Sequence, residues 1–229
     1  MTAKRAEGGR VRVWDLPTRL SHWTIVLLFG ICWWTAETDH MQWHRLAGYG
    51  VLCAVLFRLA WGFCGGQTAR FSNFVRGPAA TLRYARTLFG HAGDESLAPI
   101  GHNPLGALSI VAMLGLLVLQ TTFGLFAVNV DGDRSGPWSR WVSFETGRRF
   151  AHWHAANFQL LLLLIGVHLT AIGFYRFARK ENLVPAMVHG FKGHSLPSQA
   201  APYFVPWWRA VLLAAGIFIC VALLVNTHW

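Results

Sequence analysis

Charged residues are scarce in this chain, and acidic residues are the scarcest of them. Asp, Glu, Lys and Arg make up 13% of the 229 residues, and only 10 are acidic. A soluble domain carries about 25% charged residues, so this composition excludes an ordinary soluble protein. There are 4 cysteines and no CxxC pair. This excludes dithiol and zinc motifs of that kind and the CxxCH attachment of a c-type haem, and we interpret the cysteines as packing residues.

Apolar stretches are long where charges are missing. The chain is 54% hydrophobic, and its five long apolar stretches are roughly 20–36, 46–63, 104–128, 156–175 and 208–226. Each is close to the length of about 17–25 residues that crosses a bilayer as a helix. The sequence therefore predicts an all-α membrane protein, a four-helix transmembrane bundle plus a fifth transmembrane helix at the C-terminus. The predicted divisions are an arm at 1–19, the bundle at 20–175, a connection at 176–207 and the last helix at 208–229.

The basic residues are placed unevenly around these stretches. The net charge is +10, and Lys and Arg gather before the first stretch, between the second and third, and after the fourth. Cytoplasmic loops are the ones enriched in Lys and Arg, which predicts a bacterial inner-membrane protein with a cytoplasmic N-terminus. The polar first residues contain no cleavable signal peptide, so we expect the first span to act as its own insertion signal. The connection 129–150 is expected to be an exposed outer loop. This placement favours membrane lipid, not nucleic acid, as the partner of the positive charge.

Two histidines in one apolar stretch, His154 and His168, are the most informative feature. Over 14 residues a helix rises about 21 Å and returns to within about 40° of the same face. Imidazoles inside a membrane are uncommon and usually functional. By depth, His22 falls at the level of His168, and His44 at the level of His154. Each pair comes from two different helices, so a porphyrin fits between its two imidazoles.

Two matched pairs predict two b-type haems, each with both axial positions filled. Such haems carry electrons and do not bind oxygen. Three alternatives stay open: hydrogen-bonded packing histidines, a proton relay, and a metal pair at His40 and His44, four residues apart. His152 points about 200° away from His154 on a helix, so the 14-residue step selects His154 as the ligand.

Arginines next to these histidines provide a second indication. Arg58 follows His44 by 14 residues, so it shares that helix face at the inner level. A membrane arginine is costly unless paired, and haem propionates are anions that its fork grips in a bidentate manner. Arg45 and Arg19 adjoin histidines at the two levels and are also predicted to contact haem propionates. The alternatives are lipid headgroup contact for Arg45 and Arg19, and snorkelling to the interface for Arg58.

Four segments carry a resemblance to a known family: VWDLPTRLSHW, WHRLAGYGVLCAVLFRLAWG, GHNPLGALS and HAANFQLLLLLIGVH. Over about residues 11–190 the chain resembles the bacterial cytochrome b561 family, which includes the b-type cytochrome subunits of nickel–iron hydrogenases. The resemblance implies a four-helix bundle with two b haems, whose iron ligands are His22, His44, His154 and His168. It also implies electron transfer between a membrane quinone and a hydrogenase or periplasmic cytochrome c. The fifth span looks like a subfamily extension.

The leading hypothesis is therefore a transmembrane electron conduit, a cytochrome that serves a quinone-linked oxidoreductase as a subunit. Quinone is expected at the inner end, around Arg58, His102, Asn103 and the connection 64–103. The alternative is a self-contained superoxide:quinone oxidoreductase, in which basic residues of the outer loop steer an anion to the outer haem; these are Arg134, Arg140, Arg148 and Arg149. A haem-free proton or metal transporter is a third hypothesis. The sequence leaves open the direction of electron flow and whether the chain forms a homodimer.

Overall fold

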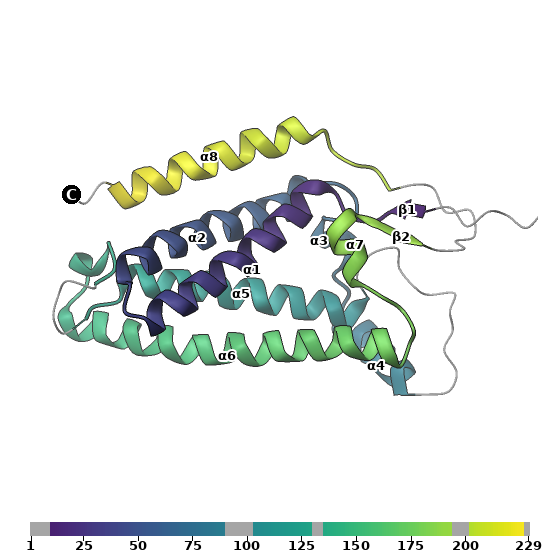
Figure 1. Ribbon diagram of the computed structural model, residues 1–229, viewed down its shortest axis with the longest axis horizontal. Coiled ribbons are helices and arrows are strands. Elements are labelled where there is room, and N and C mark those ends of the chain that lie inside the picture. The colour runs from purple at the N-terminus through teal and green to yellow at the C-terminus, as the bar shows by residue number, and fades with distance from the viewer. Residues whose placement is uncertain (1–9, 90–102, 130–134, 194–201, 227–229) are drawn as a thin grey trace, which may run out of the picture.

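The computed structural model describes residues 10–89, 103–129, 135–193 and 202–226 and is mostly helical (Figure 1). Its long helices are α1 (Leu16–Glu37), α2 (Met41–Cys64), α5 (Pro104–Phe126), α6 (Phe144–Phe177) and α8 (Trp207–Asn226). The short elements are β1 (Arg10–Arg12), α3 (Phe71–Phe74), α4 (Pro78–Phe89), the 3-10 turn η2 (Ser139–Trp141), α7 (Val184–His189) and β2 (Phe191–Gly193).

Among the described residues, four helices are long and apolar enough to cross a membrane, namely α2, α5, α6 and α8. A multi-pass membrane protein is thus supported, including the predicted C-terminal span. The first predicted span, near residues 20–36, is not one of these four, so a total of five spans is not confirmed. Its helix α1 has 22 residues, which is long enough. Its most apolar part is less apolar than that of the other four, because Arg19, Ser21 and His22 lie in its first turns and Glu37 lies at its end.

The long helices form a bundle of antiparallel neighbours. Helix α1 packs along α2, α5 packs along α6, and α2 joins the two pairs by packing on α5. Val51 and Val55 of α2 meet Leu117 of α5 and Leu161 of α6 in the core. Helix α8 lies outside this bundle against α2 (Figure 1). The observed packing has the predicted arrangement of four bundled helices with one further helix at the C-terminus.

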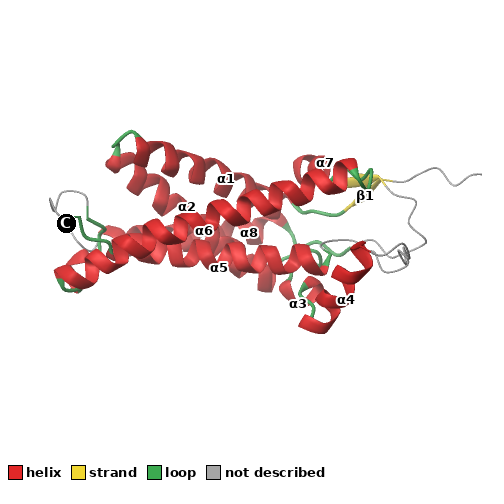
Figure 2. Ribbon diagram, turned by 90° about the horizontal axis from the view of Figure 1, so that it is seen from below, coloured by secondary structure: helices red, strands yellow, loops and turns green. Residues whose placement is uncertain are grey.

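The two ends of the bundle differ. One end carries β1, β2, α4 and α7, and the other carries the α1–α2 turn and the α5–α6 connection (Figure 2). We call them the inner end and the outer end. Strands β1 and β2 pair antiparallel, with Val11 opposite Lys192. The prediction of an all-α protein missed this two-stranded sheet, because each strand has 3 residues and too few positions to show an alternating pattern.

Helix starts follow from their capping residues. Asp15 accepts a 2.8 Å hydrogen bond from the Thr18 N–H at the start of α1, and Asn103 accepts one of 2.7 Å from the Gly106 N–H at the start of α5. Side-chain oxygens satisfy helix N–H groups in this way. Helix α6 has 34 residues, about 51 Å, and starts at Phe144. The expected exposed loop 129–150 therefore ends in helix, because Ser143 caps α6 through the Thr146 N–H at 3.2 Å.

Candidate functional site

His44 and His154 lie opposite each other at the outer end. Their ring centroids are 6.1 Å apart, and the ring planes make an angle of 75°. The Nδ1–H of His44 donates to the Cys32 carbonyl at 2.9 Å, and the Nδ1–H of His154 donates to the Gln120 carbonyl at 2.9 Å. A carbonyl accepts only, so the proton is held on Nδ1. Each Nε2 then carries the lone pair that a metal needs.

The separation of the outer pair is the one expected for a metal held between two imidazoles. A metal–imidazole bond is about 2.0–2.1 Å, and two such bonds in line put the ring centres about 6 Å apart. The observed separation of 6.1 Å agrees. Gly48 follows His44 by one helical turn, and a Cβ added there would have nothing within 4 Å. Gly124 packs on the other ring, since its added Cβ would lie 3.1 Å from His154 Cε1. Gly48 therefore leaves open space one turn from His44, and Gly124 allows the His154 ring to pack closely on α5.

A polar network surrounds His154 within the bundle. The Gln120 amide nitrogen lies 3.1 Å from His154 Nε2, and Gln120 Oε1 accepts a hydrogen bond from Asn157 at 2.6 Å. Asn157 also donates to the Leu116 carbonyl at 3.0 Å. The Gln120 amide thus donates to the nitrogen that a metal would take. Sequence reasoning missed both residues. The available signal was the position of Asn157, three residues after His154 on the same helix.

His22 and His168 are brought together at the inner end. The two imidazoles interact electrostatically, and both are half-buried. His22 Nδ1 is buried and has no hydrogen-bond partner, which costs about 1–3 kcal/mol for a buried polar atom. An imidazole with an unsatisfied buried nitrogen, next to a second imidazole, is chemically suited to hold a metal. The structure therefore pairs the same histidines that depth predicted.

Arg58 has a carboxylate neighbour that the sequence did not reveal. Its side chain is 6% exposed, donates to the Ala69 carbonyl at 3.4 Å and lies over the Phe71 ring at 5.3 Å. Asp15 acts on it electrostatically. Asp15 is 3% exposed and accepts a 3.0 Å hydrogen bond from Trp61 Nε1. Arg58 therefore does not snorkel, and its contact with a haem propionate stays a prediction.

Arg19 and Trp23 clamp α7 onto α1 on either side of His22. Arg19 Nη1 donates to the Val188 carbonyl, and Trp23 Nε1 donates to the Met187 carbonyl at 3.1 Å. These two carbonyls lie near the end of α7, which a left-handed Gly190 with φ of 90° terminates. The inner histidine is thus flanked by contacts to a segment more than 160 residues away in the chain.

Other candidate residues do not join the histidine pairs. His40 precedes the first residue of α2 and makes no side-chain capping hydrogen bond. Its Nδ1 lies 3.0 Å from Thr38 Oγ1, so His40 and His44 are not a helical i,i+4 pair. No cluster of three metal-binding side chains occurs within the described ranges. His152 is exposed, and Arg149 pairs with Glu145 at 2.5 Å. His91, His102, Arg134, His194 and His228 lie outside the described residues.

A second polar cluster occupies the inner end of α6. Tyr175 OH lies 2.8 Å from Tyr84 OH and accepts a hydrogen bond from the Asn103 amide at 2.7 Å. Tyr175 follows His168 by seven residues, which is close to two helical turns, so the two side chains share a face of α6. Asn103 was expected near this end. The tyrosines were missed, although the seven-residue step from His168 was visible.

Comparisons with known proteins agree with the resemblance found in the sequence. The profile of a family described as prokaryotic cytochrome b561 matches residues 13–190. A relative from Azotobacter chroococcum mcd 1, described as a probable Ni/Fe-hydrogenase B-type cytochrome subunit, is 23% identical over 215 residues. The match covers 80% of this chain and 88% of the relative. No solved structure matches the chain.

Proposed function

This chain belongs to the prokaryotic cytochrome b561 family, and from that premise we propose that it binds two b haems and carries electrons between a quinone and a redox partner across the bacterial inner membrane. The observation that supports this most directly is the outer histidine pair, with ring centroids 6.1 Å apart and both Nδ1 protons held by carbonyls. Family membership makes the chain a b-type cytochrome of electron transfer. The number of haems and the partners are the proposal.

The proposed ligands are His44 and His154 for the outer haem, and His22 and His168 for the inner haem. A haem with two imidazole ligands, when bound, supplies a one-electron carrier with no open coordination position. Helix α6 contributes one ligand to each level, about 21 Å apart along its axis. That spacing covers most of the hydrocarbon core, which is about 30 Å thick.

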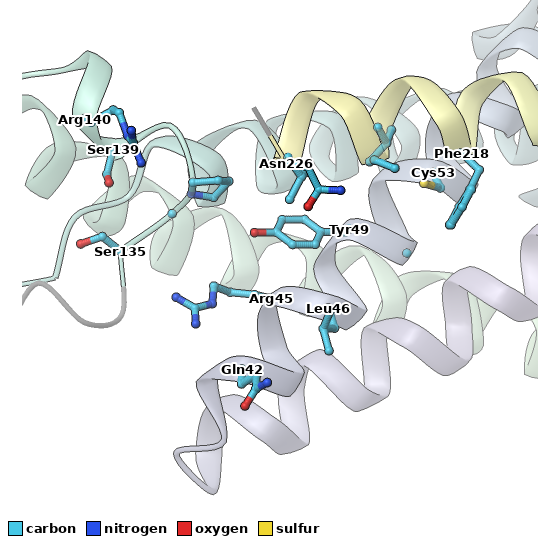
Figure 3. Close-up of a pocket in the computed structure, with 16 residues that line it drawn as sticks. Gln42, Arg45, Leu46, Tyr49, Cys53, Ser135, Ser139, Arg140, Phe218 and Asn226 are labelled. Atoms are coloured by element: carbon cyan, nitrogen blue, oxygen red, sulfur yellow. The ribbon is translucent and has the colours of Figure 1, made fainter. Parts of the chain in front are cut away.

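The arginines are proposed to contact the haem propionates. Arg58 is the best supported, because it is buried and a guanidinium has five donors, of which the Ala69 carbonyl receives one. Arg19 already donates to Val188, and Arg45 lines a cavity toward α8 (Figure 3). A propionate contact from either would add to these interactions.

The inner end is proposed to face the cytoplasm and to bind the quinone. The described inner segments carry a basic excess, including Arg10 and Arg12 of β1 and Arg83 and Arg86 of α4, as expected for the cytoplasmic side. In this topology α1 crosses the membrane, and three of its polar residues, Thr18, Ser21 and Thr35, are buried in the protein. The outer end then meets the periplasmic partner, a cytochrome c or a hydrogenase-type protein. The Azotobacter relative is described as a probable Ni/Fe-hydrogenase subunit, which supports a hydrogenase-type partner.

Tyr175, Tyr84 and Asn103 are proposed to hydrogen-bond the quinone. Hydroxyl and amide groups donate to quinone carbonyls, and reduction of a quinone takes up two electrons and two protons. Tyr84 belongs to α4, an amphipathic helix at this end, so its hydroxyl links Tyr175 toward the aqueous side. These residues would hold the proton that the quinone oxygen receives or releases.

The test measures haem content and quinol-driven reduction in lipid nanodiscs. Two b haems per chain and haem reduction by added quinol are expected. Tyr175→Phe should retain both haems and slow the reduction at least tenfold, whereas Tyr203→Phe, an exposed tyrosine before α8, should not slow it. Fewer than about two haems per chain would overturn the di-haem proposal. Unchanged kinetics in Tyr175→Phe would overturn the proposed quinone contacts alone.

A further inference from the structure

Glu181 lies just beyond the inner end of α6, where the chain turns back onto Tyr175. The turn is made at Lys180, whose φ of 56° is left-handed, and it brings the Glu181 N–H to the Tyr175 carbonyl at 2.9 Å. Glu181 also acts electrostatically on Tyr175. A carboxylate is thus placed beside a residue that is proposed to hydrogen-bond the quinone.

The Glu181 side chain reaches water as well as the protein. Its Oε1 pairs with Lys192 Nζ of β2, and the side chain is 35% exposed. Lys192 belongs to the two-stranded sheet, where it lies opposite Val11, so the ion pair joins the end of α6 to this sheet. The pair holds the carboxylate at the boundary between Tyr175 and the aqueous phase.

Glu181 differs from the other polar groups of this end in being a base that water can reach. Within the described residues, Arg179 and Tyr84 are the other charged or titratable groups that act on Tyr175. Neither is a base at neutral pH, because a guanidinium and a tyrosine hydroxyl both keep their protons. The other described carboxylate of the inner end, Asp15, is 3% exposed, and its two oxygens already accept hydrogen bonds.

We propose that Glu181 carries the quinone proton between Tyr175 and the inner aqueous phase. This inference rests on the proposed quinone contacts of Tyr175, Tyr84 and Asn103, and it adds the base that those contacts need. Oxidation of a quinol there releases two electrons, which leave singly for the inner haem, and one proton from each of its two oxygens.

Each proton on this route moves by exchange of O–H bonds. The quinol O–H bond breaks as its proton goes to the Tyr175 oxygen, and the Tyr175 O–H bond breaks as its proton goes to a Glu181 carboxylate oxygen. A general base takes a proton directly or through one water, and the partly exposed Glu181 then releases it to water. Reduction of a quinone runs the same steps in reverse. Glu181 is thus a positioning residue that acts on the quinone through Tyr175.

The experiment uses the full haem-loaded protein in lipid nanodiscs and follows haem reduction by added quinol over a range of pH. Glu181→Gln removes the base and keeps the shape of the side chain. Lys192→Gln is the matched control, since it breaks the same ion pair but leaves the carboxylate in place. Glu181→Asp keeps a carboxylate on a shorter side chain.

Glu181→Gln should retain both haems and reduce them about tenfold more slowly or more, as expected for loss of a positioned proton acceptor. Its rate should rise steadily with pH, because hydroxide replaces the missing base, and added formate should restore it in proportion to concentration. The wild type should not respond to formate. Lys192→Gln should be slowed by no more than about twofold, since surface ion pairs contribute little, and Glu181→Asp should recover most of the rate.

Three results would overturn this role of Glu181. Equal slowing of Glu181→Gln and Lys192→Gln, without acceleration by formate, would show that only the ion pair matters. An unchanged rate in Glu181→Gln, beside a slowed Tyr175→Phe, would overturn the proton role and leave the proposed quinone contacts standing. Unchanged kinetics in Tyr175→Phe, or no reduction of the wild type by quinol, would overturn the quinone contacts and the proton role together.

Discussion

The outer and inner histidine pairs are held by different parts of the chain. At the outer end each ring is fixed by a helix that precedes it directly: His44 of α2 by Cys32 of α1, and His154 of α6 by Gln120 of α5. Each helical hairpin thus orients its own histidine. At the inner end His22 Nδ1 has no partner, and its neighbours on α1 are clamped to α7.

The outer histidines are thus held by helices close to them in the sequence, whereas the inner pair also depends on segments far away in the sequence. The outer rings need two hairpins to form, and their ring nitrogens are then preset for a metal. The inner pair depends in addition on the inner-end segments, which include α7 and the buried Asp15 next to Arg58. We therefore expect the outer haem to tolerate disturbance of the inner end, and the inner haem to be the first one lost.

Removal of one histidine on α6 tests the comparison most strongly. His154→Ala should lose the outer haem and His168→Ala the inner haem, so each variant binds one haem per chain. The reason is that each imidazole is one of two proposed ligands at its own level only. Haem content is measured by pyridine haemochrome and the remaining haem by electron paramagnetic resonance.

His152→Ala is the control for these variants, because His152 is exposed and two residues from His154. It should keep both haems. Loss of both haems in His168→Ala alone would show that the levels are not independent. Identical spectra of the two single-haem variants would contradict the assignment of one pair to each level.

Asp15→Asn should have the second largest effect, a weaker hold on the inner haem. The change leaves the buried Arg58 without its carboxylate neighbour and replaces the charged acceptor of the Trp61 Nε1 hydrogen bond, which costs about 1–3 kcal/mol. Heating should then release the inner haem well before the outer haem. Glu37→Gln, at the opposite end of α1, should stay within about 0.5 kcal/mol of the wild type. Thermal unfolding followed by haem absorbance distinguishes the two results, and simultaneous loss of both haems would contradict the local role of Asp15.

Much of the fold was predictable because membrane helices carry strong apolar signals. The helices α2, α5 and α8 match the expected stretches closely. Helix α1 is the exception, since Arg19 and His22 lower its mean hydropathy. These are also two of its predicted site residues. Strands β1 and β2 were beyond prediction, because their pairing joins Arg10 to Gly193 and is decided by tertiary contacts.

The candidate site was likewise predictable only in part. The histidines that depth and helical periodicity paired are neighbours in space, because both are regular properties of a helix in a bilayer. Their role as haem ligands stays a prediction. Asp15 and Gln120 were missed, since their roles arise from contacts between different helices. The partner of Arg58 in particular comes from the start of α1, which no spacing rule connects to α2.

Gly124→Ala should disturb the outer level alone. A Cβ at this position would lie 3.1 Å from His154 Cε1, so the ring must shift by a few tenths of an ångström, which disturbs its hydrogen bond to the Gln120 carbonyl. We expect an altered outer-haem signal in electron paramagnetic resonance and a changed potential, with the inner haem unaffected. Gly115→Ala on the same helix is the matched control, since nothing lies within 4 Å of its added Cβ. It should leave both signals unchanged and stabilise α5 by about 0.5–1 kcal/mol. An identical response of the two variants would show that Gly124 does not shape the outer site.

Trp23→Phe is expected to have the smallest effect on stability, and this effect should be confined to the inner haem. It deletes the 3.1 Å hydrogen bond to the Met187 carbonyl while keeping an aromatic ring beside His22, so the cost is about 1 kcal/mol. Because this bond holds α7 next to the inner histidine, the inner haem should show a broadened signal and faster loss on heating. Trp34→Phe, an exposed tryptophan at the outer end of α1, should leave both haems as in the wild type. If Trp23→Phe instead weakened the outer haem equally, the clamp would stabilise the bundle as a whole. The inner level would then not depend on α7 more than the outer level does.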